Sequence, residues 1–375
     1  MQCAHFHQKI SKNGEKKANY SKYTIQYQVC RSTRAKTKSK IKSDKLRLNN
    51  RTSNSDTIIQ YLRAFIYYVK ARSNVYIFAF ATLVSSILGS HMTGIDYSIS
   101  IQVVIASYFM ALATYIYNDI ADMEVDKINK TNRPSVTGKS TKKQLIVIVS
   151  VLNGIALLLV SSMGLYTTCI SVLFISLGIA YSHPKLNLKH KFPLKTLVTA
   201  AGAGLLSLLG GVAAITTTTD ASYGNNVIFF SSLLPIIYAA LFFFAFFFIL
   251  GPLGDIGDLK GDRAVGRRTF PIVLGIRSTI LVMLSIPIMI LAMTLSLTYY
   301  SYHVDLSTAS GTNTHRIMFI NPSGIYLMVS SCIATLVFIL RISKKTDDAL
   351  AIKSIRPKMR FLHILLQISL VVIFI

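Results

Sequence analysis

Two short stretches of the chain carry the same triplet of aspartates, spaced by three and then four residues. They are Asp119, Asp122 and Asp126 in the first stretch, and Asp255, Asp258 and Asp262 in the second. On a helix with 3.6 residues per turn these positions share one face, so each triplet can present its carboxylates together. Carboxylate oxygens suit Mg²⁺, which combines one or two of them with the phosphates of a substrate. The triplets therefore predict one shared metal site that binds a phosphate-bearing molecule.

The alternative is that these acids only form ion pairs with neighbouring Lys and Arg side chains. Seven of the fifteen acidic residues of the chain lie in the two stretches, each at the end of a long apolar segment. Ionisable groups at such depth are costly, and ion pairing alone requires neither regular spacing nor a second copy. Function is therefore the favoured interpretation. Glu124 points away from the stripe and is not expected to be a ligand.

The elements that must position these acids are membrane-spanning helices. The chain has 375 residues, of which 52% are hydrophobic and only 15% charged, and its mean hydropathy is +0.49. Apolar runs long enough to cross about 30 Å of hydrocarbon are found at 75–95, 98–118, 143–162, 164–181, 195–217, 227–250, 275–299, 320–340 and 359–375. The sequence therefore predicts an all-α integral membrane protein with a nine-helix bundle.

The formal net charge of +25 is explained by topology. With the N-terminus in the cytoplasm, 39 of the 40 Lys and Arg residues fall on the cytoplasmic side, and only Arg316 falls outside. This distribution obeys the positive-inside rule, so the positive charge is explained without nucleic acid as a partner. Both acid stretches then lie on the cytoplasmic face. We expect the plasma membrane of a prokaryote in preference to an organelle membrane.

The N-terminal region differs from the rest of the chain. Residues 1–56 are polar and carry 14 basic against 3 acidic side chains, a composition that predicts a disordered tail attracted to anionic lipid headgroups. Residues 57–73 predict an amphipathic helix lying at the membrane interface. Residues 74–375 form the expected nine-helix domain. Within its fifth span, small residues such as Ala203, Ser207 and Gly211 indicate close helix packing.

Three motifs resemble those of the UbiA-type intramembrane prenyltransferases. Asn118 to Asp126 with Arg133-Pro134 is similar to the family's NDxxDxxxD…RP signature, and Asp255 to Asp262 to its DxxDxxxD motif. Tyr181 to Lys185 resembles its YxxxK motif. The resemblance covers roughly residues 60–375 and implies a central cavity, open near the cytoplasmic side, with the two acid motifs facing each other. In one departure, Arg72-Ser73 stands where the family often has Arg-Pro, so a role for Asn74 is not expected.

The resemblance also implies roles for individual residues. The metal ligands would be Asn118, Asp119, Asp122, Asp126, Asp255, Asp258 and Asp262, and the diphosphate would lie against Asn118, Arg133, Tyr181, Lys185 and Lys189. Further cations on the same face, namely Lys139, Arg267 and Arg268, are secondary candidates. The phenylalanines at 242–244 and 246–248 either pack in the bundle or line a tunnel for the prenyl chain.

The expected activity is Mg²⁺-dependent transfer of a polyprenyl group from an isoprenoid diphosphate, such as geranylgeranyl diphosphate, to a lipophilic acceptor. The acceptor would be a quinone or other aromatic precursor, or a prenylglyceryl phosphate of ether-lipid synthesis. Two alternatives remain open at this point: a related terpene cyclase without an acceptor, and a secondary transporter that uses intramembrane carboxylates. The sequence does not indicate an oligomeric state.

Overall fold

The computed structural model describes the chain except for residues 1–53, 95–96, 129–132, 220–225, 309–320 and 345–348. It divides into two compact units, Met1–Leu62 and Arg63–Ile375. Helix α3 (Asn54–Ala71) crosses their boundary and covers most of the segment for which an interfacial helix is expected. Its place on a membrane surface stays a prediction. The predicted disordered tail, residues 1–56, lies outside the described residues, apart from the first turn of α3.

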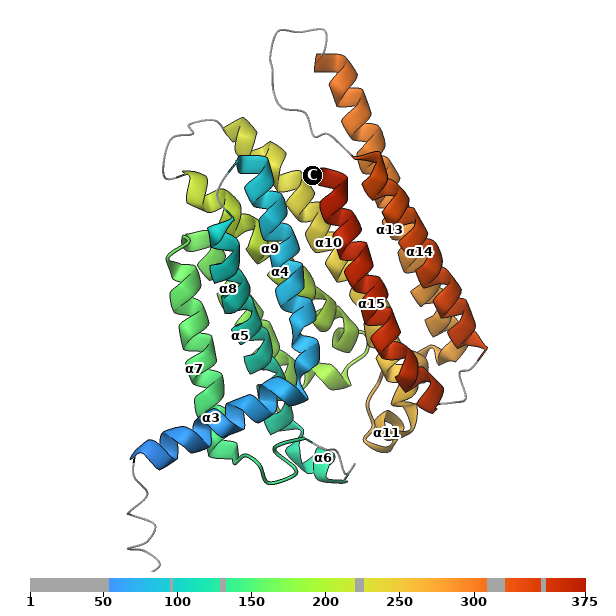
Figure 1. Cartoon of the computed structure of the whole chain (residues 1–375). Coiled ribbons are helices and arrows are strands. Elements are labelled where there is room, and N and C mark those ends of the chain that lie inside the picture. The colour runs from blue at the N-terminus through green and yellow to red at the C-terminus, as the bar shows by residue number, and fades with distance from the viewer. Residues whose placement is uncertain (1–53, 95–96, 129–132, 220–225, 309–320, 345–348) are drawn as a thin grey trace, which may run out of the picture. The chain divides into compact units, whose positions relative to one another are not determined.

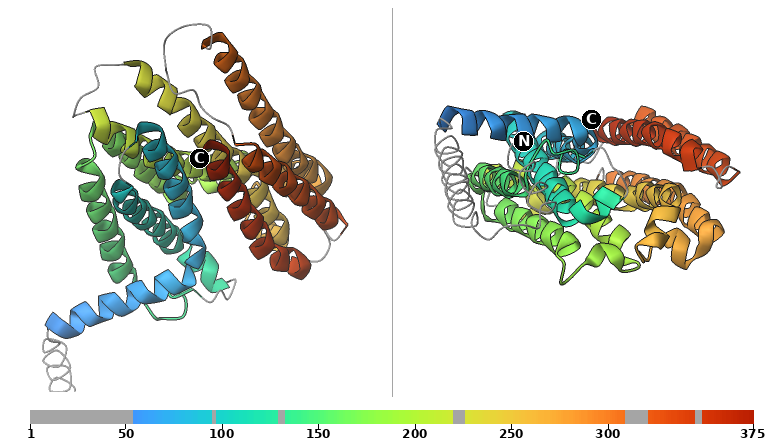
Figure 2. Two further views of the ribbon diagram at one scale, coloured as in Figure 1. Left: turned by 45° about the horizontal axis from the view of Figure 1, so that its top comes forward. Right: turned by 90° about the horizontal axis from the view of Figure 1, so that it is seen from below.

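The second unit consists of helices that run alongside one another (Figures 1 and 2). Its long helices are α4 (Tyr76–Thr93), α5 (Ser98–Ala121), α7 (Lys142–Ser161), α8 (Leu165–Ser182), α9 (Leu194–Thr219), α10 (Asn226–Gly257), α13 (Gly275–Thr308), α14 (Pro322–Ser343) and α15 (Ala349–Phe374). Nine helices of the described part are long and apolar enough to cross a membrane, and no strand occurs in those ranges. The all-helical prediction with nine spans is confirmed.

Short elements connect the long helices. They are η2 (Ser73–Val75) before α4, α6 (Met123–Ile128) after α5, η3 (Leu188–His190) between α8 and α9, and α11 (Leu259–Ala264) and α12 (Phe270–Val273) after α10. α6 and α11 lie at the same end of the second unit, at the bottom of Figure 1. The two segments that follow the acid-bearing helices therefore share one end of the bundle.

One span extends further than the sequence indicates. The apolar run ends at residue 250, but α10 continues past Pro252 to Gly257 because Leu253 and Ile256 are buried and extend its packed face. The second acid stretch therefore begins within the last turn of a spanning helix and not in a loop beyond it.

Helix α9 packs against α4, α8 and α10. Its small residues permit this, as predicted: a side-chain carbon at Gly210 would collide with the backbone oxygen of Thr82 on α4. Ser207 and Ser85 share a buried hydrogen bond of 2.6 Å across the same interface. These close contacts hold α4 against α9, and α9 also packs against α10, which carries the second acid stretch. The first acid stretch is on α5, which packs against α4.

Candidate active site

Both acid triplets sit on a helix that is interrupted at the middle aspartate. Asp122 ends α5 with φ −94° and ψ 3°, and α6 begins at the next residue. Asp258 separates α10 from α11 in nearly the same conformation, φ −110° and ψ 11°. Our expectation of one uninterrupted helical stripe is therefore wrong in detail. The stripe nevertheless survives, because the amide of Asp126 still donates to the Asp122 carbonyl oxygen (2.8 Å) and that of Asp262 to Asp258 (2.9 Å).

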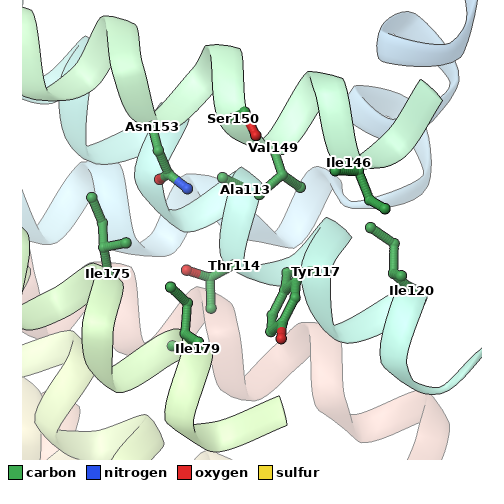
Figure 3. A pocket seen from close by; sticks show the side chains of 11 residues that line it. Ala113, Thr114, Tyr117, Ile120, Ile146, Val149, Ser150, Asn153, Ile175 and Ile179 are labelled. Carbon is green, nitrogen blue, oxygen red and sulfur yellow. The ribbon is translucent and has the colours of Figure 1, made fainter. Parts of the chain in front are cut away.

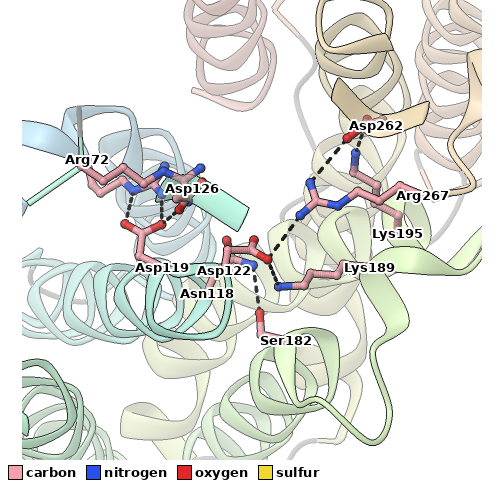
Figure 4. Close-up of polar contacts among 11 residues, drawn as sticks. Arg72, Asn118, Asp119, Asp122, Asp126, Ser182, Lys189, Lys195, Asp262 and Arg267 are labelled. Carbon is pink, nitrogen blue, oxygen red and sulfur yellow. Dashed lines mark hydrogen bonds and ion pairs between the residues drawn. The ribbon is translucent and has the colours of Figure 1, made fainter. Parts of the chain in front are cut away.

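The first triplet is buried and paired with basic side chains from distant segments. Asp119 accepts hydrogen bonds from Arg72, whose Nε lies 3.0 Å from Oδ2, and from Arg133 Nη1 at 2.9 Å from Oδ1. Arg133 also pairs with Asp126. Lys189 Nζ, itself buried, lies 2.7 Å from Asp122 Oδ1. All three acids thus have a cationic partner (Figure 4).

The second triplet is arranged in a related way, with one exposed member. Lys195 Nζ, at the start of α9, lies 2.6 Å from Asp255 Oδ1 and 3.4 Å from Asp262 Oδ2. Asp258 is half-exposed and pairs at 3.0 Å with Arg356 of α15. Asp255 and Asp262 are buried and face the interior of the site, whereas Asp258 lies at its edge.

A single guanidinium joins the two triplets. Arg267 Nη2 lies 3.2 Å from Asp122 Oδ1, and its Nη1 lies 3.4 Å from Asp262 Oδ1. Figure 4 shows this side chain between the carboxylates of the two helices. Arg267 lies 145 positions after Asp122 in the chain and nevertheless contacts an aspartate of each triplet. This is the geometry that the duplicated spacing predicts.

The donor set fits a divalent metal together with a diphosphate, although the carboxylates now bind cations. Among the described residues, no group of three or more His, Cys, Asp or Glu is close enough to hold a metal alone. Asp255 Oδ2, however, is buried without a hydrogen-bond partner in the described part of the chain, as is Arg267 Nε. An unpaired acceptor and an unpaired donor at one charged site match a ligand that carries both metal and phosphate oxygens.

Burial alters the ionisation of groups in the loops of the site. It raises the pKa of the Asp126 carboxyl above its usual range, against the opposing effect of Arg133. It lowers the pKa of the Lys189 ammonium, against the hydrogen bond to Asp122. Desolvation also lowers the pKa of His190, helped by Arg267. Perturbed ionisation of neighbouring groups is typical of functional sites.

An inner pocket of about 170 Å³ adjoins the paired charges. Its polar wall includes Arg72, Asn118, Arg133 and Tyr181, and its apolar wall includes Phe78 and residues of α8 and α9. Asn118 is held by a hydrogen bond of 2.9 Å from its amide to Ser182 of α8. The pocket can therefore place a hydrocarbon chain beside the charged groups.

The third motif is divided by the structure. Tyr181 lines the inner pocket, but Lys185 is exposed, and its ammonium has no ion-pair partner within the part of the chain that the structure describes. Lys189, four residues later, reaches the acids in its place. Of the secondary candidates, Arg267 is central, whereas Arg268 is exposed and Lys139 lies over the ring of Tyr67. Basic residues that are close together in one loop therefore differ in whether they reach an aspartate, because their side chains leave the loop in different directions.

Sequence reasoning missed three cations of the site. Arg72 was noted only as a departure from the family pattern, and Lys195 and Arg356 were not singled out. Lys195 and Arg356 lie on the predicted cytoplasmic face, which is rich in basic residues because of the positive-inside rule. A positive charge there does not by itself indicate a residue of the active site. Glu124 is 83% exposed and pairs with Lys127, as expected for a residue off the stripe.

The phenylalanines of α10 pack in the bundle core. Phe242, Phe243 and Phe246 are fully buried around His363 of α15, whose ring stacks on Phe246 at 4.0 Å. They do not line the inner pocket. The packing interpretation is therefore the correct one for these three residues. His363 gave no signal in the sequence because its neighbours come from another helix.

Known proteins resemble this chain over both its sequence and its fold. Residues 77–362 match the model of the UbiA prenyltransferase family. A digeranylgeranylglyceryl phosphate synthase from Sulfurisphaera tokodaii is 33% identical over 106 residues, which are 28% of this chain and 36% of that protein. A chloroplastic 2-acyl-4-prenylphloroglucinol 6-prenyltransferase from Humulus lupulus is 26% identical over 169 residues, which are 44% and 39%. The matched stretches thus span less than half of these relatives.

Solved structures share the fold over most of their length. A structure of digeranylgeranylglyceryl phosphate synthase in membranes has a TM-score of 0.59 at 17% identity, covering 84% of this chain and 98% of its own. A UbiA homologue from Archaeoglobus fulgidus bound to DMAPP and Mg²⁺ has a TM-score of 0.52 at 14% identity, covering 81% and 98%. The family match, the fold and the paired acid motifs agree, and this chain belongs to the UbiA prenyltransferase family.

Proposed function

We propose that this prenyltransferase catalyses the Mg²⁺-dependent transfer of a polyprenyl group from an isoprenoid diphosphate to a lipophilic acceptor. The observation that carries the proposal is the contact of one side chain, Arg267, with an aspartate from each triplet. Two acid clusters that meet at one cation form a site for a ligand that offers positive charge to the carboxylates and negative charge to the basic side chains. A metal diphosphate has both kinds of charge.

In this proposal the seven side chains of the two acid motifs hold Mg²⁺ at the mouth of a central cavity. These ligands are Asn118, Asp119, Asp122, Asp126, Asp255, Asp258 and Asp262. When bound, Mg²⁺ supplies Lewis-acid neutralisation of the charge that develops on the leaving diphosphate. The unpaired Oδ2 of buried Asp255 supports the assignment, since a metal gives this oxygen the partner that it lacks.

The basic side chains bind the diphosphate oxygens. Arg72, Arg133 and Arg267 offer planar guanidinium groups that suit bidentate contacts with phosphate, and Lys189 and Lys195 add point charges. In the structure these basic side chains form ion pairs with the carboxylates of the acid motifs. A substrate therefore exchanges ion-pair partners inside the site and does not leave buried charges unpaired. Tyr181 and Lys185 are assigned to the same diphosphate from the third motif.

The apolar wall of the inner pocket orients the prenyl chain and excludes water. The bond between the first prenyl carbon and the diphosphate oxygen breaks with its electrons leaving on the diphosphate, so the allylic carbon becomes electron-deficient. Water would capture this carbon, and a dry pocket prevents the loss. Phe78 and the neighbouring apolar side chains of α8 and α9 surround the place where the carbon lies.

The acceptor is assigned to one of two classes, a quinone or other aromatic precursor or a prenylglyceryl phosphate. The two named relatives act on one class each, which supports both. The basic residues on the face of the acid motifs support a cytoplasmic N-terminus and a site that opens to the cytoplasm of a prokaryotic cell. The amphipathic α3 is assigned to the membrane surface next to that face.

The test is an assay on membranes that contain the full chain. They are incubated with Mg²⁺, radiolabelled geranylgeranyl diphosphate and, separately, hydroxybenzoate, homogentisate, dihydroxynaphthoate and geranylgeranylglyceryl phosphate. The expected result is a prenylated product with one acceptor, which disappears when EDTA is added. A cyclised hydrocarbon formed without any acceptor would contradict the proposal and indicate a terpene cyclase. Full activity in EDTA would contradict the metal assignment.

A further inference from the structure

A second hollow, of about 380 Å³, lies between α5, α7 and α8. Its walls are mostly apolar, and Ile146 on α7 and Ile179 on α8 stand at its rim, both nearly half exposed. All three helices are candidate membrane spans, so the rim faces lipid. Figure 3 shows the side chains of the three helices directed into this outer groove. None of the charged side chains of the candidate active site lines this groove.

A thin partition separates the outer groove from the inner pocket. Thr114 of α5 and Gly178 of α8 line both spaces. A side-chain carbon placed on Gly178 would lie only 2.9 Å from Cγ2 and Oγ1 of Thr114, so the two helices are in close contact here. The wall at this point is one side chain thick. That side chain is Thr114, whose hydroxyl donates a hydrogen bond of 3.0 Å to the Met110 carbonyl oxygen.

The position of this partition determines what can pass through it. Thr114 and Gly178 each lie four residues, one helical turn, before Asn118 and Ser182, whose side chains are hydrogen bonded. Asn118, Arg72 and Arg133 mark the diphosphate end of the inner pocket. A molecule that passes the partition therefore arrives at the reacting carbon of the donor. The inner pocket is assigned to the prenyl chain of the donor, so the outer groove is left for the acceptor.

The volumes of the two spaces lead to the same conclusion. Sites for ligands of drug size have volumes of about 300–1,000 Å³. The inner pocket, at about 170 Å³, is too small for a prenyl chain and an acceptor together. The outer groove, at about 380 Å³, provides the remaining space.

The polar groups of the groove indicate the chemistry of the occupant. Asn153 of α7 lines the groove, and its Oδ1 is buried without a hydrogen-bond partner in the described part of the chain. A polar side chain with an unpaired atom beside the groove suits a ligand that has a hydrogen-bonding group of its own. Ser150 and Tyr117 add hydroxyl groups nearby. A lipophilic molecule with a hydroxyl group matches this lining.

We infer that the outer groove binds the acceptor, a lipophilic molecule with a hydroxyl group that enters from the lipid, and that the Thr114–Gly178 contact is the window to the donor. This inference rests on the proposed function. In the reaction, the nucleophilic oxygen or ring carbon of the acceptor bonds to the first prenyl carbon as the diphosphate leaves. The acceptor loses one proton, which the released diphosphate accepts.

The test compares tryptophan at two adjacent positions on the lipid-facing side of α7. Ile146→Trp fills the rim of the groove, whereas Val147→Trp adds the same side chain at an equally exposed position outside it. The KM for geranylgeranyl diphosphate and the KM for the acceptor are measured separately, with whichever of the four panel acceptors the wild-type protein uses. Asn153→Leu is assayed in the same way.

The expected result is that Ile146→Trp and Asn153→Leu raise the acceptor KM by about tenfold or more, with the donor KM unchanged. Val147→Trp should match the wild-type protein in both constants. Equal acceptor KM values for Ile146→Trp and Val147→Trp would overturn the inference and leave the proposed function intact. If Ile146→Trp does not insert, Ile179→Trp fills the same rim from α8. A wild-type protein that prenylates no panel acceptor would contradict the proposed function itself, and the inference with it.

Discussion

Every aspartate of the two triplets already has a cationic partner, so in the proposed function ion pairing and metal binding are successive states of one site. The cations come from six separate segments, namely Arg72, Arg133, Lys189, Lys195, Arg267 and Arg356. Five of them contact buried carboxylates. Removing one acid therefore leaves its cation without that partner, in addition to removing a proposed metal ligand.

The first prediction concerns the acids. Asp119→Ala and Asp255→Ala should each lower kcat by at least about a hundredfold, because each removes an oxygen that stabilises the charge of the reacting complex. Turnover is measured in membranes at equal amounts of inserted protein. Glu124→Gln is the control and should retain most of its activity, since this side chain is exposed and off the stripe. Normal activity in either aspartate variant would reject the two-motif site.

The second prediction separates two adjacent arginines. Arg267→Gln should lower kcat/KM for the donor by about a hundredfold, because it removes the cation that bridges Asp122 and Asp262. Arg268→Gln removes the same charge from the same loop, but its side chain is exposed and makes no ion pair in the described ranges. It should behave like the wild-type protein. Equal losses in both variants would show that net loop charge, and not the bridge, is what matters.

At the scale of the elements, the two acid-bearing helices are interrupted at equivalent residues. Asp122 and Asp258 share nearly the same backbone angles, and each is followed by a six-residue helix. The interruption redirects the chain while the third acid of each triplet keeps its hydrogen bond to the middle residue. The packing of α5 against α4, and of α9 against both α4 and α10, connects these two acid-bearing helices.

The third prediction tests that packing. Gly210→Ala should lower the free energy of unfolding by about 1–3 kcal/mol, because the new methyl group collides with the Thr82 carbonyl oxygen, which belongs to the backbone and cannot rotate away. Stability is measured by thermal unfolding in detergent. Gly154→Ala on α7 is the matched control. Nothing lies within 4 Å of the added carbon there, and alanine is the better helix former by about 1 kcal/mol. Equal stability of the two variants would contradict the packing argument.

At the scale of the whole molecule, the site and the outer groove are both built within the unit Arg63–Ile375. The basic tail contributes none of the residues that we assign to the substrates or the metal. It carries 14 of the 40 basic residues of the chain, which suit attraction to anionic lipid.

The fourth prediction follows from this division. A chain that lacks residues 2–56 should insert into membranes and retain the prenyl transfer rate per inserted molecule. The rate is measured with the same donor and acceptor as for the full chain, after the amount of inserted protein has been determined. A truncated chain that inserts but does not turn over would show that the tail acts in catalysis and is not accessory.

The sequence alone determined the class of the protein, the number of spans and the identity of the acids. Spans follow from local apolar length, and the acids follow from a spacing that repeats, so neither requires knowledge of distant contacts. The family also follows from motifs that are local in the chain. The lengthening of α10 to Gly257 was missed because burial of Leu253 and Ile256 depends on neighbouring helices.

Only the tertiary structure decided which cations serve the site. Lys185 and Lys189, and likewise Arg267 and Arg268, are equivalent by charge and neighbourhood in the sequence, yet one of each pair reaches an aspartate and the other faces out. Which residue of a pair reaches the aspartate depends on the path of the backbone after the turn, and the packing of the helices determines that path. The outer groove is also tertiary in origin, because its three walls belong to different helices, and no local pattern encodes the distance between them.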